Sequence, residues 1–503
     1  MRVSTQNAEA QKLFSQGLAL VYGFNHDEAV RSFQAALKAD PNLAMGWWGI
    51  ALANGSNYNL PSMADREKAA FEAIQKAQAM APKASPRERD YIATLAKRYT
   101  GQENADYAAL GLTYANAMRE LHQKYPEDLD AATLFAESMM NLRPWKLWTW
   151  DGKMEPGTDE IVATLESVLK RDPHHLGANH YYIHAVEAGP HAAYALPSAH
   201  RLGDLAPGAG HLVHMPSHIY YRTGDFADAA KVNVAAANAD RAYLERSKAE
   251  GIYPLMYYSH NIHFESYART MQGRYADAMR TAKQLEEHVS PYVKAMPMLE
   301  GFMPTSLLTA ARFAKWDDIL KWPAPPKEQA FVTGLWHYAR GAAFAAKKQF
   351  ADADREQAAL TQIQQTIDPK AIMMQNPQQY VLGMAVNDLA GRIAVARKDY
   401  DSALAAFTKA TELQDHLVYI EPPEWYYPVR ESLGAAHLAA GNAAEAEKVF
   451  RQELEHSPRN ARALAGLAES LRRQQKADDA VFIEREQKIA WKDADGPLPA
   501  LLP

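Results

Sequence analysis

Apolar residues along most of this chain recur three or four positions apart, which is the spacing of an amphipathic helix. The stretch "GLALVYGFNHDEAVRSFQAALKADP", which ends on Pro41, contains two such apolar runs separated by a short turn. The alternation of apolar and polar residues that is typical of a strand does not persist over any useful length. The pattern therefore predicts an all-α chain.

The same helix–turn–helix pattern returns along the chain. A second clear copy, "LGAAHLAAGNAAEAEKVFRQELEHSP", ends on Pro458. Further turns of this kind are "YYRTGDFADAAKVN", "ARTMQGRYADAMRTA", "AAKKQFADADREQ" and "ARKDYDSALAAF". A single helix pair of this sort cannot bury its apolar face, so neighbouring pairs must stack against it. The sequence thus predicts a solenoid of helix pairs.

The repeat resembles the tetratricopeptide repeat (TPR) family, which has a small residue in the first helix, alanine and an aromatic residue in the second, and then proline. The matching residues are Gly17, Ala29, Phe33 and Pro41, and again Gly434, Ala446, Phe450 and Pro458. The resemblance implies a TPR-like right-handed superhelical α-solenoid. A repeat of about 34 residues predicts about ten to twelve helix pairs. We expect residues 1–495 to form one such array, with His-rich central repeats at about 129–290, and 496–503 to be a frayed tail.

Composition narrows the classes of function. The chain has 503 residues, 48% of them hydrophobic and 23% charged, and a net charge of -6, which indicates a globular protein with a large core. It contains no basic run of the kind that binds nucleic acid and no stretch of roughly 18 apolar residues that could span a membrane. The absence of cysteine excludes disulfides, thiolate catalysis and cysteine-held metal clusters.

The location of the protein follows from weaker signals. The beginning of the chain, "MRVSTQNAEAQKLF", has no apolar signal core, so we expect a cytoplasmic protein or one that is already processed. The lack of cysteine fits a protein that avoids stray disulfides. A periplasmic or exported location is therefore the expectation, with a cytoplasmic location as the alternative.

Histidines are concentrated in two segments of the central repeats. "HLVHMPSH" holds His214 and His218 one helical turn apart, and "NHYYIHAVE" holds His180 and His184 with the same spacing, 34 residues earlier. Residues four apart on a helix have side chains about 5–6 Å from each other, so two imidazoles can share one ion. The repeated pair predicts a metal site.

In a TPR-like array, positions 2, 5, 9, 12 and 13 of each first helix line the concave groove. The resemblance therefore implies that seven histidines face this groove, and their spacing predicts that they are metal ligands: His180, His184, His211, His214, His218, His260 and His263. Imidazole suits zinc, copper, iron and nickel. With this many histidines, we expect one or two transition metal ions per chain. Because the site has no thiolate, copper or iron is favoured, with zinc as the alternative. Glu187 and Glu137 are candidate catalytic groups, as ligands, as residues that orient the rings, or as a general base.

Three segments lengthen their repeats, 141–157, 242–259 and 368–384, and long insertions in a compact array are often functional. The first contains "RPWKLWTWDG", which is too irregular for a helix and which we expect to cover a substrate. The predicted substrate-binding residues are Arg143, Trp145, Trp148, Trp150, Tyr258 and Tyr267. Pro216 should kink the helix that carries the histidines, because proline removes one backbone hydrogen bond.

Three functions remain open. The first is a metal-dependent oxidoreductase acting on a small organic substrate in the groove. The second is a non-catalytic TPR scaffold that binds a peptide or protein partner, and the third is a protein that binds or delivers metal. Phosphate-binding, dinucleotide and nucleophile-elbow motifs are missing, and "HYYIH" is not the H-E-x-x-H of a zinc protease because Tyr181 takes the place of its glutamate.

Overall fold

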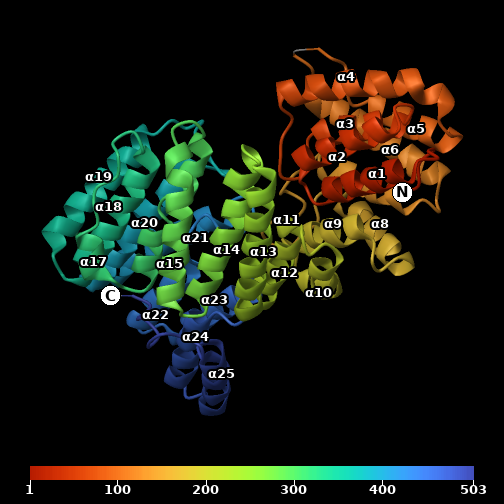
Figure 1. The fold of residues 1–503 in the computed structure, drawn as a ribbon. Coiled ribbons are helices and arrows are strands. Elements are labelled where there is room, and N and C mark those ends of the chain that lie inside the picture. The colour runs from red at the N-terminus through yellow and green to blue at the C-terminus, as the bar shows by residue number, and fades with distance from the viewer. Residues whose placement is uncertain (103, 503) are drawn as a thin grey trace. The chain divides into compact units, whose positions relative to one another are not determined.

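The computed structural model describes residues 1–102 and 104–502, and in these ranges the chain is almost entirely helical. The predicted all-α architecture of TPR-like stacked helix pairs is confirmed. The chain divides into two compact units, residues 1–216 and residues 217 onward. In each unit, consecutive helices run back and forth beside one another (Figure 1).

Unit 1 consists of consecutive helix pairs followed by one short helix. The five pairs are α1 (Ala8–Tyr22) with α2 (His26–Ala39), α3 (Ala44–Asn54) with α4 (Ala64–Met80), α5 (Pro86–Ala96) with α6 (Tyr107–Lys124), α7 (Leu129–Met140) with α8 (Thr158–Arg171), and α9 (Leu176–Val186) with α10 (Leu196–Leu205). The short helix α11 (Gly210–His214) follows.

Unit 2 continues the same pattern. Its seven pairs are α12 (Pro216–Thr223) with α13 (Phe226–Ser247), α14 (Tyr258–Met271) with α15 (Tyr275–Val289), α16 (Thr305–Arg312) with α17 (Trp316–Leu320), α18 (Ala330–Ala346) with α19 (Phe350–Thr366), α20 (Gln378–Ala396) with α21 (Tyr400–Asp415), α22 (Arg430–Ala439) with α23 (Ala443–His456), and α24 (Ala461–Arg473) with α25 (Ala477–Ala490). Within the described residues, the number of helix pairs in the two units together agrees with the predicted ten to twelve.

The small and aromatic residues of the repeat pattern pack directly on each other. The buried ring of Phe33 lies between Gly17 and Gly49, where a Cβ atom on either glycine would be 2.6 Å from the ring. Phe450 lies between Gly434 and Gly466 in the same manner. The pattern therefore reflects a close approach of helices that only glycine permits.

This close approach gives a testable prediction. Gly434→Ala is expected to lower the free energy of unfolding by about 1–3 kcal/mol, because its Cβ would be 2.7 Å from the ring of Phe450 and would overpack the core. Gly203→Ala is the matched control, since a Cβ in this helix meets nothing within 4 Å. It should leave the free energy unchanged or raise it by up to about 1 kcal/mol. Urea denaturation measures both. Equal effects of the two substitutions would contradict the packing argument.

The three predicted insertions are ordered. Residues 141–157 contain an isolated antiparallel bridge between Trp148 and Met154. Residues 242–259 include the end of α13 and the π-helical turn η3 (Tyr253–Tyr257), while 368–384 include the short strands β1 (Ile372–Met373) and β2 (Asn376–Pro377). Among the described helices, none has the length and apolar character that crossing a membrane requires.

A buried carboxyl group ties the second insertion to its neighbours. Asp240 of α13 accepts hydrogen bonds from the Tyr253 hydroxyl at 2.8 Å and from the Asn261 amide at 2.7 Å. Burial raises the pKa of Asp240 to about 7, although these two hydrogen bonds oppose the shift. Asp240 is therefore partly protonated at neutral pH, while an aspartate in the unfolded chain is ionised above about pH 4.

The stability of the chain should depend on pH through this group. Between about pH 4 and pH 7 the folded state binds more protons at Asp240 than the unfolded state, so its contribution to the free energy of unfolding falls as pH rises. Asp240→Asn should therefore gain stability relative to the wild type between pH 5 and about pH 8. Urea denaturation at the two pH values measures this difference in the free energy of unfolding. The control is Asp228→Asn, because Asp228 is exposed. A constant difference across this range would contradict it.

Candidate metal centre

Two helices of unit 1 carry its predicted histidines. The side chain of His175 caps the start of α9 by accepting the amide hydrogen of Ala178. His180 and His184 follow one turn apart on α9, and both are buried. Helix α11 carries His211 and His214 and ends at His214, and α12 begins at Pro216, so the chain is divided into two helices where a kink was predicted.

His180, His184 and His211 form a compact cluster. The Nε2 atoms of His180 and His211 are 3.2 Å apart, and one ligand atom from each of the three rings lies within 4.8 Å of the others. Two nitrogen atoms bound to one tetrahedral ion at about 2.0–2.1 Å are roughly 3.3 Å apart. The spacing therefore fits a shared metal ion. The ring of His214 lies next to that of His211, with centroids 5.8 Å apart.

Hydrogen bonds fix which nitrogen of two rings faces the cluster. Nδ1 of His180 donates to the backbone carbonyl of Tyr22 at 2.5 Å, and Nδ1 of His184 donates to a carboxylate oxygen of Glu187 at 2.9 Å. Each acceptor requires the proton on Nδ1, so the lone pair of the neutral ring is on Nε2. This arrangement makes Nε2 of His180 and of His184 the atoms that could hold a metal ion.

Aromatic rings surround the cluster. Phe24, in the turn between α1 and α2, has ring centroids 4.6 Å from His180 and 5.6 Å from His211. Tyr58 and Trp145 lie 5.1 and 5.6 Å from His184. All these side chains are buried, so the histidines lie in an environment with little water. Sequence analysis missed Phe24 and Tyr58, which carry no distinguishing pattern of their own.

The two predicted acidic groups occupy different surroundings. Glu187 is buried and holds His184, as described above. Glu137 of α7 accepts a hydrogen bond from the Asn141 amide at 2.5 Å. Burial raises the pKa of Glu137, and the positive charge of Arg98 opposes this shift. Both of these neighbours of Glu137, Arg98 and Asn141, line a pocket of about 390 Å³ whose lining includes none of the predicted histidines.

Of the predicted substrate-binding residues in the first insertion, Trp145 contacts the histidine cluster. Trp148 donates from its indole nitrogen to the carbonyl of Ala185 at 2.7 Å and thereby packs on the end of α9. Trp150 is 41% exposed. Arg143 forms an ion pair with Glu155 at 3.1 Å within the insertion. The insertion therefore contributes one ring to the site and otherwise packs beside it.

Unit 2 gathers the remaining predicted histidines. Nδ1 of His218 is 2.9 Å from a carboxylate oxygen of Glu421, and the rings of His218 and His260 have centroids 5.9 Å apart. His260 and His263 line a small pocket of about 70 Å³ together with Glu421 and Tyr267. Glu421 was missed by sequence analysis, because nothing in the chain links it to a histidine 203 positions earlier.

Two predicted site residues of α14, His263 and Tyr258, have different surroundings. Burial lowers the pKa of His263 to about 4, so this ring is neutral at physiological pH. Tyr258, predicted to bind substrate, instead packs in an apolar cluster and places its ring edge-on to His288, with centroids 5.1 Å apart. Tyr258 is thus part of the core, while Tyr267 lines the pocket.

The fold and the site together define an α-solenoid protein with a buried histidine cluster. No family model matches the chain, and no curated protein sequence does. Among solved structures, the human IFIT1 dimer with PPP-AAAA is 13% identical, covering 97% of this chain and 96% of its own, with a TM-score of 0.37. Yeast Tom70 is 13% identical, covering 97% and 93%, with a TM-score of 0.29.

Proposed function

We propose that this protein binds a transition metal ion through His180, His184 and His211. The observation that carries the proposal is the pair of Nδ1 hydrogen bonds, to the Tyr22 carbonyl and to Glu187, because they leave Nε2 as the ligating atom of two rings. The third ring, His211, lies 3.2 Å from the first. Rings oriented in this way before binding lose little freedom when the ion enters.

The set of ligand atoms limits the choice of metal ion and points to a more specific, catalytic function. Imidazole ligands without thiolate suit copper, iron or zinc, and we favour copper or iron. Three protein ligands leave a coordination position open, as in catalytic metal sites. We therefore propose, as the finer function, an oxidoreductase acting on a small organic substrate. Glu187 orients His184 in this function, and the ring of Trp145 helps to exclude water.

Elemental analysis of the tag-free full chain tests the proposal. We expect about one equivalent of copper or iron in the wild type, and less than about a tenth of this in the double variant His180→Ala/His211→Ala. The matched control is His174→Ala/His191→Ala, which removes two exposed histidines and should retain the metal. Circular dichroism verifies that each variant is folded.

The possible outcomes test metal binding and the oxidoreductase function separately. A folded wild type that is metal-free and rejects added copper, iron and zinc would overturn metal binding altogether. One equivalent of zinc, without copper or iron, would support the proposed metal site but overturn the assignment as an oxidoreductase. In the first case the second candidate remains, a scaffold that binds a peptide or protein partner, which the stacked helix pairs of both units favour.

A further inference from the structure

Three buried arginines of unit 2 surround one pocket, whose lining includes no histidine. Arg312 ends α16, Arg392 lies in α20 and Arg462 lies in α24, and they are 7%, 6% and 7% exposed. Together with Tyr426 and Tyr427 they line a pocket of about 180 Å³. A buried guanidinium group loses its hydration, so its charge needs a partner nearby.

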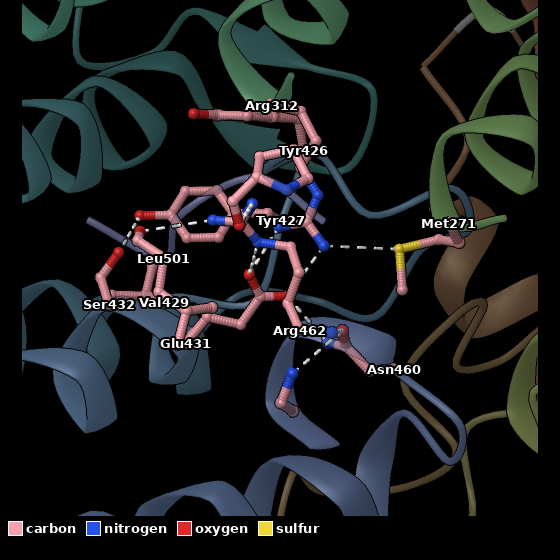
Figure 2. A network of polar contacts seen from close by, with 12 residues as sticks. Met271, Arg312, Tyr426, Tyr427, Val429, Glu431, Ser432, Asn460, Arg462 and Leu501 are labelled. Carbon is pink, nitrogen blue, oxygen red and sulfur yellow. Dashed lines mark hydrogen bonds and ion pairs between the residues drawn. The ribbon is translucent and has the colours of Figure 1, made fainter. Parts of the chain in front are cut away.

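Two buried carboxylates offset part of the positive charge of these arginines. Glu431 lies between two of the arginines (Figure 2): Arg312 donates to both of its oxygens at 2.6 and 2.8 Å, and Arg462 donates at 2.8 Å. Asp388 accepts a hydrogen bond from Nε of Arg392 at 2.6 Å. Three guanidinium groups therefore face two carboxylates, and one positive charge is left in excess.

The other titratable groups at the pocket do not cancel this charge. Burial raises the pKa values of Tyr426 and Tyr427, so both remain neutral donors at physiological pH. Glu453 is linked to Glu431 through the amide of Asn460. Burial, and then the charge of Glu431, raise the pKa of Glu453 to about 8, so this group is mostly protonated at pH 7.

The end of the chain forms one wall of the pocket. Arg462 donates to the carbonyl oxygens of Pro499, Ala500 and Leu501 at 3.2, 2.9 and 3.3 Å. Ala500 and Leu502 line the pocket itself. Residues 499–501, which belong to the segment predicted to be frayed, thus lie against α24. These three carbonyl groups are neutral acceptors for Arg462 and therefore do not offset the charge of the guanidinium groups.

We propose that the pocket between Arg312, Arg392 and Arg462 binds a small oxyanion, a phosphate or a carboxylate. Guanidinium groups form paired, charge-assisted hydrogen bonds with both kinds of group. The bound anion supplies the missing negative charge, while the neutral tyrosine hydroxyls and the tail enclose it. All residues that line this pocket belong to unit 2.

Calorimetric titration of the full chain tests the site, with inorganic phosphate in one arm and succinate in the other, at constant ionic strength. We expect one anion per chain, bound at least about tenfold more weakly by Arg392→Gln and by Ala346→Phe. Ala346 lines the pocket, so phenylalanine fills the space while the three arginines and their carboxylates stay in place. Arg355→Gln is the control, because Arg355 is exposed and pairs with Asp352 on the same helix.

Each result decides the proposal. Binding of phosphate alone identifies a phosphorylated ligand, binding of succinate alone a carboxylate, and binding of both a general oxyanion site, provided that Ala346→Phe weakens it. The absence of saturable binding in both arms, or wild-type affinity in Ala346→Phe, would overturn the proposal. If Arg392→Gln does not fold, as judged by circular dichroism, Ala346→Phe decides alone.

Discussion

Glu431→Gln is expected to lower the free energy of unfolding by about 3–5 kcal/mol, the cost of breaking a buried ion pair from one side. Glu431 is fully buried and accepts hydrogen bonds from Arg312, Arg462 and Asn460. Glutamine keeps the shape but removes the charge, and therefore leaves two guanidinium groups without their carboxylate. Urea denaturation at pH 7 measures the loss.

The pH dependence of this effect provides a second check. Burial by itself raises the pKa of Glu431. The positive charges of Arg312 and Arg462 outweigh this effect and lower the pKa to about 2. The folded state therefore binds fewer protons here than the unfolded state between about pH 2 and pH 4.5, and the contribution of Glu431 is lost as pH falls through this range. The penalty of the substitution should shrink accordingly.

A half-buried glutamate at the surface gives the matched control for Glu431. Glu469 pairs with Arg472 and Arg473 at the surface of α24, where ion pairs contribute about 0–1 kcal/mol. Glu469→Gln should therefore change the free energy of unfolding by at most about 1 kcal/mol. If both substitutions lowered the free energy of unfolding by similar amounts, the buried Arg312–Glu431–Arg462 group would contribute no more to stability than a surface ion pair.

Glu187→Gln is expected to weaken metal binding about 10–100-fold while the chain remains folded. The carboxylate of Glu187 fixes the proton of His184 on Nδ1 and increases the basicity of Nε2, which neutral glutamine does less well. Competition with a chromophoric chelator measures the affinity. This prediction rests on the proposed metal centre, and it assigns Glu187 as a positioning residue.

The control for Glu187 is another glutamate in the same unit that also accepts a hydrogen bond. Glu166 of α8 accepts from the Tyr182 hydroxyl at 2.7 Å and is exposed. Glu166→Gln should bind metal as the wild type does. Unchanged affinity in Glu187→Gln, with the metal still lost in His180→Ala/His211→Ala, would preserve the site but remove the positioning role.

The repeat architecture could be predicted from the sequence because it depends on local periodicity. Apolar spacing defined the helices, and the glycine and phenylalanine positions of the first and last copies correspond to the close contacts seen at Phe33 and Phe450. Histidines four apart on one helix were expected to lie close together, and His180 and His184 do so. The third ring of this cluster belongs to His211, and not to His214 or His218, which are the equivalents of the first two on the neighbouring repeat.

The partners of these residues depend on how the helix pairs stack, and no local pattern encodes that. The carbonyl of Tyr22 and the ring of Phe24 reach the histidines from a helix pair more than 150 residues earlier in the chain. Glu431 joins Arg312 over 119 positions, and the tail reaches Arg462. The sequence by itself determined the helix pairs and the candidate ligands. The tertiary structure alone decided which distant groups orient those ligands and which buried charges share a pocket, because such contacts arise only when separate repeats pack.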